Sequence, residues 1–351
     1  MISLLLPIGI LVSAGLITLL SISPHLFFLQ LLWAIIGMAI MVSPFFFFDW
    51  RIIVNFRWLI GGLYALSVLL LTAALTIGPV IRNARSWLVL GPLSFQPVEL
   101  AKIALILFYA SYFSRRHLAI ARWKTLITSF VLFVVPAVLV ALQPNLGSAL
   151  ILFGIWFGFL LTSGLPLRRL AVVLLAFAIA GVFMWSYFLR PYQRARIVGI
   201  LYPETNALGI NYSTAQSKIA IGSAGFWGKG YGQGPETQLG FLPVPESDFI
   251  LAALIEQWGI FGALIVIGSF LFLIFQILKI GAAAEGNFEK FICLGTVIVF
   301  GIQFIVNGGS ELGFLPVIGV PFPFLSYGGS SLVSNFFLMA LVAGIKKHHK
   351  A

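Results

Sequence analysis

"FILAALIEQWGIFGALIVIGSFLFLIFQIL", residues 249–278, is the stretch that decides the fold. Its one charged side chain is Glu256, and it exceeds the roughly 20 apolar residues that a helix needs to cross a bilayer. We predict a membrane-spanning helix here, long enough to tilt or to extend beyond the bilayer. Asp248 directly precedes this run, in a chain whose other aspartate is Asp49. An acid at the mouth of such a helix calls for an explanation.

The same apolar character recurs along the whole chain. Charged residues make up 9% of it and hydrophobic residues 60%, and the mean hydropathy is +1.07. The apolar runs do not alternate with polar residues as the strands of a membrane barrel do. The fold class predicted is therefore all-α, a polytopic membrane protein forming one integral membrane domain over residues 1–351. The ten predicted spans are roughly 3–22, 27–48, 57–77, 98–114, 125–142, 148–164, 168–188, 249–278, 290–307 and 325–345.

The basic residues indicate how these spans are oriented. The net charge is +11, but lysines and arginines cluster in short connections between apolar runs. This is typical of topology signals and anionic lipid contacts, and it argues against nucleic acid. Ten spans place both termini on one side, and the basic clusters, such as 115–124 and 346–350, favour the cytoplasm for both. The first run is interpreted as a span and not a cleaved signal, and the single Cys293 excludes an intrachain disulfide.

Three connections on the predicted outer face are candidates for function. The connection 79–97 is polar and interrupted by prolines, and 189–248 forms a large extracytoplasmic loop between spans seven and eight. The third, 308–324, is rich in glycine and proline, so we predict no regular helix there. Long loops on a rigid scaffold are where chemistry usually occurs.

Several polar residues allow both a structural and a functional interpretation. Asp248 is either the N-cap of the eighth helix or a functional acid. Glu99 and Lys102 share one helix face, so they form an internal ion pair or line a substrate path. Ser326 is predicted to cap the last span, and close helix packing accounts for the rest of the 326–335 segment.

Two further segments are less specific. The stretch "QPNLGSA" (143–149) is interpreted as a turn between spans. The glycine-rich segment 211–234 lacks the Gly-Lys-Ser/Thr ending of a P-loop. It is either a flexible loop or a backbone cup for an anionic group.

The combination of these motifs is more informative than any one of them. The stretches "ARSWLVLGPLSFQPVELAK", "QPNLGSA", "YSTAQSKIAIGSAGFWGKGYGQG", "FLPVPESDFILAALIEQWG" and "GVPFPFLSYGGSSL" occur in this order. This order resembles the SEDS family (shape, elongation, division and sporulation proteins), and the forms of the motifs are more similar to its rod-shape branch. The resemblance covers residues from about 80 to 335.

The resemblance implies an activity and its location. SEDS proteins polymerise peptidoglycan glycan strands from the lipid-linked precursor lipid II, for cell-wall elongation and cell shape, on the outer face of the bacterial cytoplasmic membrane. They work with a class B penicillin-binding transpeptidase. The family's essential aspartate matches Asp248. The matched cavity residues are Arg85, Trp87, Glu99, Lys102, Gln216, Lys218, Ser326, Tyr327 and Ser330.

This residue set also suits the chemistry. A sugar hydroxyl is a weak nucleophile, so a positioned carboxylate would act as general base. The leaving lipid pyrophosphate is an anion, so cations would stabilise it and no second carboxylate is required as acid. The candidates are Arg85, Lys102, Arg194, Arg196, Lys218 and Lys229. Direct displacement inverts the anomeric centre. No cofactor follows with certainty from the sequence, although a divalent cation, Mg²⁺ or Mn²⁺, could share this work.

The chain departs from the family pattern at four places. Asn145 replaces a usual aspartate, Val98 a serine, and Gln257 a second acid, and "VPESDF" stands for a more usual "ERHTDF". None of these changes removes Asp248. A flippase for the same lipid-linked sugar and a non-catalytic scaffold for the transpeptidase are the alternatives. Because the ionisable residues gather at the outer ends of the spans, the sequence favours surface chemistry over transport.

Overall fold

The computed structural model describes residues 2–46, 57–81, 84–91, 93–115, 123–189, 191–202, 209 and 211–348. Within this part of the chain, nine helices are long and apolar enough to cross a membrane, and α7 is a shorter apolar helix. Together they confirm the ten predicted segments and the helical fold class. They are α1 (Ile2–Ile22), α2 (Pro24–Phe46), α4 (Arg57–Ile77), α5 (Pro97–Ser114), α6 (Trp123–Leu142), α7 (Leu146–Thr162), α8 (Leu167–Phe183), α12 (Ile250–Ala283), α13 (Asn287–Glu311) and α14 (Gly329–His348).

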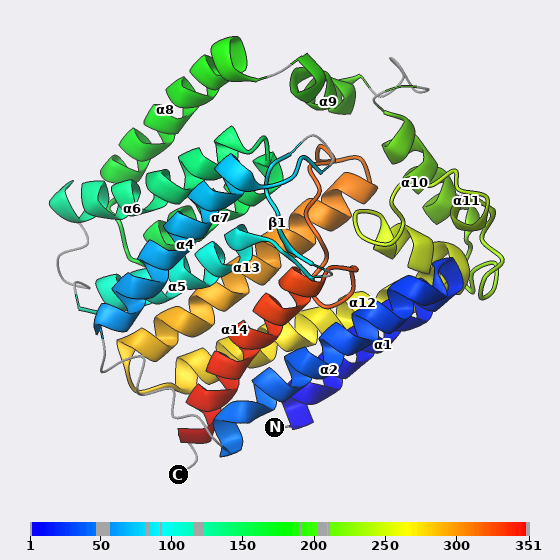
Figure 1. Ribbon diagram of the computed structural model, residues 1–351, viewed down its shortest axis with the longest axis horizontal. Helices are drawn as coiled ribbons and strands as arrows, with labels where there is room; N and C mark the ends of the chain where they lie inside the picture. The colour runs from blue at the N-terminus through cyan, green and yellow to red at the C-terminus, as the bar shows by residue number, and fades with distance from the viewer. Residues whose placement is uncertain are drawn as a thin grey trace.

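The long helices lie side by side as a bundle (Figure 1). Helix α14 packs against α2, α1 against α12, and α13 lies between α12 and α5. Helices α5 and α14 are the most deeply buried of the described spans. The first turn of α1 and the last turn of α14 lie at the same end of the bundle in Figure 1. An even number of crossings therefore fits the arrangement.

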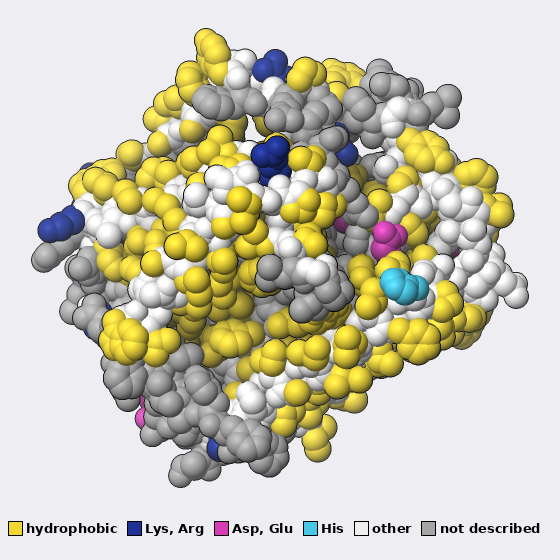
Figure 2. Space-filling view, viewed as in Figure 1, with side chains coloured by type: hydrophobic (Ala, Val, Ile, Leu, Met, Phe, Trp, Pro, Cys, Tyr) yellow, Lys and Arg dark blue, Asp and Glu magenta, His cyan; other side chains and the backbone are white. Residues whose placement is uncertain are grey.

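The surface of the bundle is apolar, as a bilayer environment requires. Hydrophobic side chains cover much of the face in Figure 2, and charged ones are few. Helix α8 is the most peripheral span, since none of its residues is buried. It contacts the bundle through Phe177, whose ring centroid lies 4.7 Å from that of Phe153 and 5.3 Å from that of Trp156. The basic cluster at 116–122 and the connection at 47–56 lie outside the described residues.

The connections 79–97 and 189–248 contain more regular structure than the sequence indicates. Strands β1 (Leu88–Leu90) and β2 (Leu93–Phe95) form an antiparallel hairpin before α5. The 189–248 connection contains α9 (Pro191–Leu201), α10 (Tyr212–Ser223) and α11 (Pro235–Gln238). The interpretation of 211–234 as a flexible loop is therefore wrong over α10, whose residues from Tyr212 to Ser223 form a regular helix.

A second correction concerns the start of the 308–324 connection. Helix α13 continues through Gly308 and Gly309 and ends at Glu311. The last turn is held by buried polar contacts: the Ser310 hydroxyl donates to the Asn307 carbonyl at 2.8 Å, and the Glu311 side chain bonds α12. Tertiary contacts therefore override the low helix propensity of glycine.

Helix α12 is interrupted at Gly259, and a glycine-rich turn fills the gap. Gly259 has φ 70° and ψ −168°, a conformation that favours glycine. The carbonyls of Glu256 and Gln257 accept the amides of Lys229 and Gly230, at 2.9 and 3.1 Å. The amides of the two residues that follow Gly259 donate to the carbonyls of residues 225 and 226, each at 3.1 Å. The turn thus supplies the backbone hydrogen bonds that the broken helix lacks.

Candidate active site around Asp248

Asp248 lies immediately before α12, next to the end of α13 and to the segment that follows α13. Its Oδ1 accepts a hydrogen bond from the Ser247 hydroxyl at 3.0 Å. The other carboxylate oxygen faces Gly319, where an added Cβ would lie 3.7 Å from Oδ2. The backbone carbonyl of Asp248 accepts from Asn307 Nδ2 at 3.1 Å, and the same amide group donates to the Val320 carbonyl at 3.0 Å. The backbone of Asp248 is therefore tied to the end of α13, and its half-buried carboxylate faces the segment that follows α13.

The interpretation of Asp248 as the N-cap of α12 is wrong. The N-cap residue is Phe249, which makes no side-chain cap hydrogen bond. The first-turn amides are bound by Glu311: Leu251 N donates to Oε1 at 3.3 Å, and Ala252 N donates to Oε2. Sequence reasoning missed this role because the partners lie about sixty positions apart. The one signal available was an acid, Glu311, within an otherwise apolar and glycine-rich stretch.

Ser326 and Tyr327 bond to the backbone just before Asp248. The Ser326 hydroxyl accepts the Phe322 amide at 2.8 Å and donates to the Ser247 carbonyl at 2.7 Å. Because α14 begins only at Gly329, the prediction that Ser326 caps it is wrong. The Tyr327 amide donates to the Glu246 carbonyl at 2.8 Å. Burial and then the Glu246 carboxylate raise the pKa of the Tyr327 phenol, so this group remains a hydrogen-bond donor near neutral pH.

Glu99 and Lys102 form the internal ion pair that was one of their two interpretations. Lys102 Nζ lies 2.8 Å from Glu99 Oε2, and both side chains are at least 95% buried. The Ser334 hydroxyl donates to the same carboxylate oxygen. Glu99 stands in the first turn of α5, where Pro97 opens the helix and an acid suits its dipole. A role in lining a substrate path stays a prediction.

Ser330 bonds the β1–β2 hairpin to the start of α14. The Ser330 hydroxyl accepts the Gln96 amide at 3.2 Å and donates to the Ser94 carbonyl at 3.3 Å. Trp87, just before β1, is half-buried, whereas Arg85 is exposed to solvent. The structure thus joins Ser326 and Tyr327 to the 246–248 segment and Ser330 to the hairpin, and it leaves Arg85 exposed.

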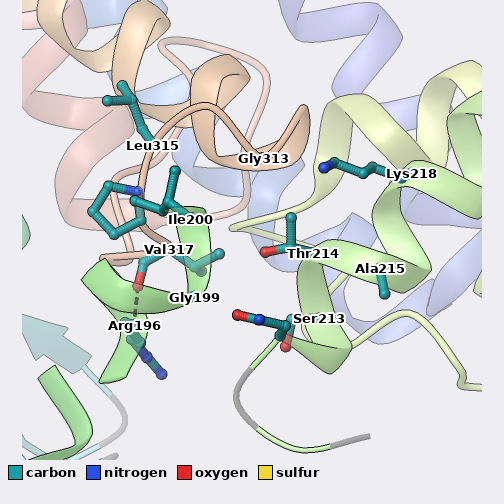
Figure 3. A pocket seen from close by; sticks show the side chains of 12 residues that line it. Arg196, Gly199, Ile200, Ser213, Thr214, Ala215, Lys218, Gly313, Leu315 and Val317 are labelled. Carbon is teal, nitrogen blue, oxygen red and sulfur yellow. Dashed lines mark hydrogen bonds between the residues drawn. The ribbon is translucent and has the colours of Figure 1, made fainter. Parts of the chain in front are cut away.

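Helix α10 lies on the other side of the Glu311 cap. The Ser217 hydroxyl donates to the Glu311 carbonyl at 2.9 Å, which fixes α10 to the end of α13. Gln216 is half-buried and Lys218 is exposed. Lys218 extends toward Gly313, where an added Cβ would lie 2.5 Å from the lysine Nζ (Figure 3). Both residues lie on α10, and Lys218 reaches the segment that approaches Asp248.

Glu256 is a structural acid that the sequence left unexplained. Its carboxylate is fully buried and accepts the amides of Glu236 and Thr237 at 2.9 and 3.0 Å, and the Thr237 hydroxyl at 2.6 Å. It therefore caps the short helix α11. Lys229 Nζ lies 3.8 Å from it. Burial and then the charge of Glu256 raise the pKa of Glu236, while Lys229 acts in the opposite direction.

Asn145 and Gln257, two departures from the family pattern, have structural roles. Asn145 is the N-cap of α7, and its Oδ1 accepts the Ser148 amide at 3.2 Å. Gln257 Nε2 donates to the Ser21 hydroxyl at 2.8 Å, and its Oε1 accepts the Gly232 amide at 3.3 Å. An amide serves both purposes, since each side chain needs an acceptor and Gln257 also donates.

Among the described residues, no three or more His, Cys, Asp or Glu side chains gather in a group that could hold a metal ion. The donor set fits a divalent cation only if the substrate supplies most of its ligands. Mg²⁺ commonly binds in this way, through one or two carboxylates, water and phosphate oxygens. Asp248 would be the protein ligand nearest to such an ion, and the involvement of a cation stays a prediction.

Fold and site together define a polytopic helical membrane protein whose extramembrane segments converge on one aspartate. The family model for FtsW, RodA and SpoVE, described as "Cell cycle protein", matches residues 1–351, so the chain belongs to that family. This is the SEDS family that the motifs resemble.

Individual relatives agree with this assignment. The peptidoglycan glycosyltransferase MrdB of Escherichia coli (strain K12) is 38% identical over 290 residues, which cover 82% of this chain and 78% of MrdB. A probable peptidoglycan glycosyltransferase FtsW of Haemophilus influenzae is 36% identical, over 81% of this chain and 71% of the relative.

Two solved structures share the fold. One belongs to a peptidoglycan synthase complex that coordinates polymerization and crosslinking. It matches with a TM-score of 0.84 and 32% identity, over 99% of this chain and 97% of that one. The crystal structure of the Thermus thermophilus rod shape determining protein RodA matches with a TM-score of 0.74 and 27% identity, over 100% of this chain and 98% of that one.

Proposed function

We propose that this protein polymerises glycan strands from lipid II and that Asp248 is its general base. Family membership and the activity named for its relatives make the chain a peptidoglycan glycosyltransferase of cell-wall synthesis. The proposal concerns the substrate and the residue that acts on it. The observation that carries it is the placement of Asp248, whose structural explanation as a helix cap is removed because Glu311 binds the α12 amides.

The chemistry needs little beyond this carboxylate and suitable cations. Asp248 would accept the proton of the attacking sugar hydroxyl as that oxygen bonds to the anomeric carbon of the second lipid II. The bond from that carbon to the pyrophosphate oxygen breaks, and the lipid pyrophosphate leaves as an anion. Ser247, bonded to Oδ1, and Asn307, bonded to the Asp248 carbonyl, would keep the base oriented for this transfer.

The distribution of buried charge supports chemistry at the membrane surface. Glu99 lies in the first turn of α5, Glu311 ends α13, and Glu256 lies before the break in α12. Each of these acids has partners in the structure that fix it in place. A transporter would need ionisable groups along the depth of several spans, and the described helices concentrate them near their ends.

The orientation and the partner complete the proposal. The basic clusters favour cytoplasmic termini, which would place Asp248 on the outer face of the bacterial cytoplasmic membrane. We also propose a class B penicillin-binding transpeptidase as partner. The support is the close match to a chain of the complex that coordinates polymerization and crosslinking.

The decisive experiment compares Asp248→Asn with wild-type protein in polymerisation of labelled lipid II, with products separated on gels. We expect Asp248→Asn to lose about 10²–10⁴ in rate, because an amide cannot accept the proton. Its expression, membrane insertion and thermal stability should remain close to wild type, since the amide is nearly isosteric with the acid. Glu285→Gln is the matched control, since it neutralises an exposed acid in the connection between α12 and α13.

Two results would contradict the proposal. Glycan formation by Asp248→Asn at more than about a tenth of the wild-type rate would show that another group is the base. A wild-type protein that moves lipid II across vesicles but forms no glycan would show that the protein is a flippase.

A further inference from the structure

We propose that the cavity between α9, α10 and the Gly313–Val317 segment binds the diphosphate of the lipid-linked donor. The inference rests on the proposed polymerase function and assigns one part of its substrate to one place. The cavity has a volume of about 120 Å³. Its polar lining side chains are Arg196, Asn211, Ser213, Thr214 and Lys218, and Val317 forms part of its wall.

Two cations face this cavity from different elements. Arg196 lies on α9 and Lys218 on α10, on opposite sides of the cavity in Figure 3. Arg196 Nη1 donates to the Val317 carbonyl at 2.7 Å, which fixes the guanidinium while leaving its other nitrogens as donors. No acid lies among the twelve lining residues. The lining therefore carries a net positive charge and several hydrogen-bond donors.

The N-terminus of α10 adds to the positive electrostatic potential of the cavity. Asn211, Ser213 and Thr214 line the cavity where α10 begins at Tyr212, whose own amide is bonded to the Gly209 carbonyl at 3.1 Å. The first amides of a helix have no partners within it and favour an anion. With the Ser213 and Thr214 hydroxyls, the cavity presents groups that commonly bind phosphate oxygens.

The other candidate cations are arranged differently. Lys102 is buried against Glu99 at 2.8 Å, and Lys229 is 3.8 Å from Glu256. Arg194 Nη2 donates to the Ser186 carbonyl at 3.0 Å, on the side of α8. Of the six cations that the sequence raised, Arg196 and Lys218 are the pair that lines this cavity.

The position of the cavity suits the reaction. Val317 forms part of its wall, and Gly319, two residues later, faces the Asp248 carboxylate. On the other side, Lys218 follows Ser217, which bonds the carbonyl of Glu311, the cap of α12. One short segment thus separates the cationic cavity from the proposed base. The acceptor hydroxyl would be activated on one side of this segment while the departing diphosphate is held on the other.

The size of the cavity limits what it can hold. Pockets for whole drug-sized ligands are about 300–1,000 Å³, so this cavity would hold a small group and not a complete disaccharide. A phosphate of an anionic membrane lipid has the same chemistry as the donor diphosphate, and the test must separate the two sources.

The test uses full-length purified protein and inorganic pyrophosphate as the probe. We expect wild type and Asp248→Asn to bind pyrophosphate equally in neutral detergent, measured by calorimetry. Arg196→Gln and Lys218→Gln should each bind it about tenfold or more weakly, because a charge-assisted hydrogen bond exceeds the 1.4 kcal/mol that corresponds to tenfold. Lys218→Arg should retain binding. Lys279→Gln, which removes an exposed charge near the far end of α12, should match wild type.

Polymerisation assays in nanodiscs show whether the cavity binds the donor diphosphate or the phosphate of a membrane lipid. We expect both Gln variants to raise the KM for lipid II in phosphatidylcholine discs, with or without phosphatidylglycerol. An effect confined to discs with phosphatidylglycerol would assign the cavity to a membrane lipid and overturn the proposal. Unchanged pyrophosphate binding in both variants would also overturn it, even if wild type polymerises lipid II normally. A wild type that binds pyrophosphate through these residues but forms no glycan would refute the polymerase function and leave an anion site.

Discussion

Removal of the Glu311 carboxylate should loosen the start of α12 and displace Asp248. Two backbone amides donate to this side chain, from Leu251 at 3.3 Å and from Ala252 at a shorter distance. Glu311 is fully buried, so in Glu311→Ala both amides would lose their acceptor away from water. An unsatisfied buried group costs about 1–3 kcal/mol. Since the Leu251 bond is long, we expect a total loss near 2–4 kcal/mol.

The effect can be measured by heating purified variants in detergent at one fixed scan rate. For a chain of this length, each kcal/mol of lost stability lowers the Tm by about 2 °C. The apparent Tm of Glu311→Ala should therefore be about 4–8 °C lower than that of wild type. Glu311→Gln keeps one acceptor oxygen and should fall between wild type and Glu311→Ala. Glu285→Ala is the matched control, since it removes an exposed acid from the connection between α12 and α13. It should stay within about 0.5 kcal/mol of wild type.

Activity provides the second measurement. Asp248 precedes the first residue of α12, Ile250, by two positions, so a loosened first turn displaces the proposed base. A misplacement of about 1 Å can cost about 10² in rate, and kcat for glycan formation should fall by that order in Glu311→Ala assayed well below its Tm. If Glu311→Ala keeps both wild-type Tm and wild-type kcat, the carboxylate does not hold this helix start, and the account of Asp248 positioning is wrong.

Three other changes test the remaining parts of the structure. Lys102→Met should leave Glu99 buried without its cation and lower the free energy of unfolding by about 3–5 kcal/mol. The double variant with Glu99→Leu should recover most of the Tm. An equal loss of Tm in both variants would contradict the ion-pair account. Asn145→Asp should leave polymerisation within about twofold of wild type, because both residues are good N-caps; a large gain would reveal a catalytic role for an acid at this position. Impermeant thiol reagents applied to intact cells should label single cysteines placed in 211–248 and spare a cysteine at Ala351, and the reverse pattern would invert the proposed topology.

The sequence predicted the spans well because their signal is local. An apolar run of sufficient length has to be helical in a bilayer, and the boundaries of α4 and α5 fall within a residue of those expected. The same local signals failed at Gly308 and Gly309, which suggested a break although α13 continues through them. There the helix is stabilised by contacts with α12 and α10, which no window of sequence contains.

The candidate site was predicted in part for the same reason. Asp248, Ser326 and Tyr327 were found through family motifs, and the structure joins them in one network. The functions of Glu311 and Glu256 were missed because each carboxylate binds amides of another segment, and those partners become neighbours only after folding. The wrong assignments of helix caps to Asp248 and Ser326 have this common origin. A cap is chosen by three-dimensional proximity as well as by sequence position.

The break in α12 at Gly259 has a consequence for how the glycine-rich turn packed against it opens. The amides of the two residues after Gly259 donate to loop carbonyls, and the loop amides of Lys229 and Gly230 donate to α12 carbonyls. These hydrogen bonds are 2.9–3.1 Å long. None of these amides can exchange with deuterium unless the loop leaves the helix. We therefore expect them to exchange at one shared rate, as a single cooperative opening unit. An added Cβ at Gly228 would lie 2.2 Å from the Gln257 carbonyl oxygen, so Gly228→Ala should accelerate exchange at all of these amides together.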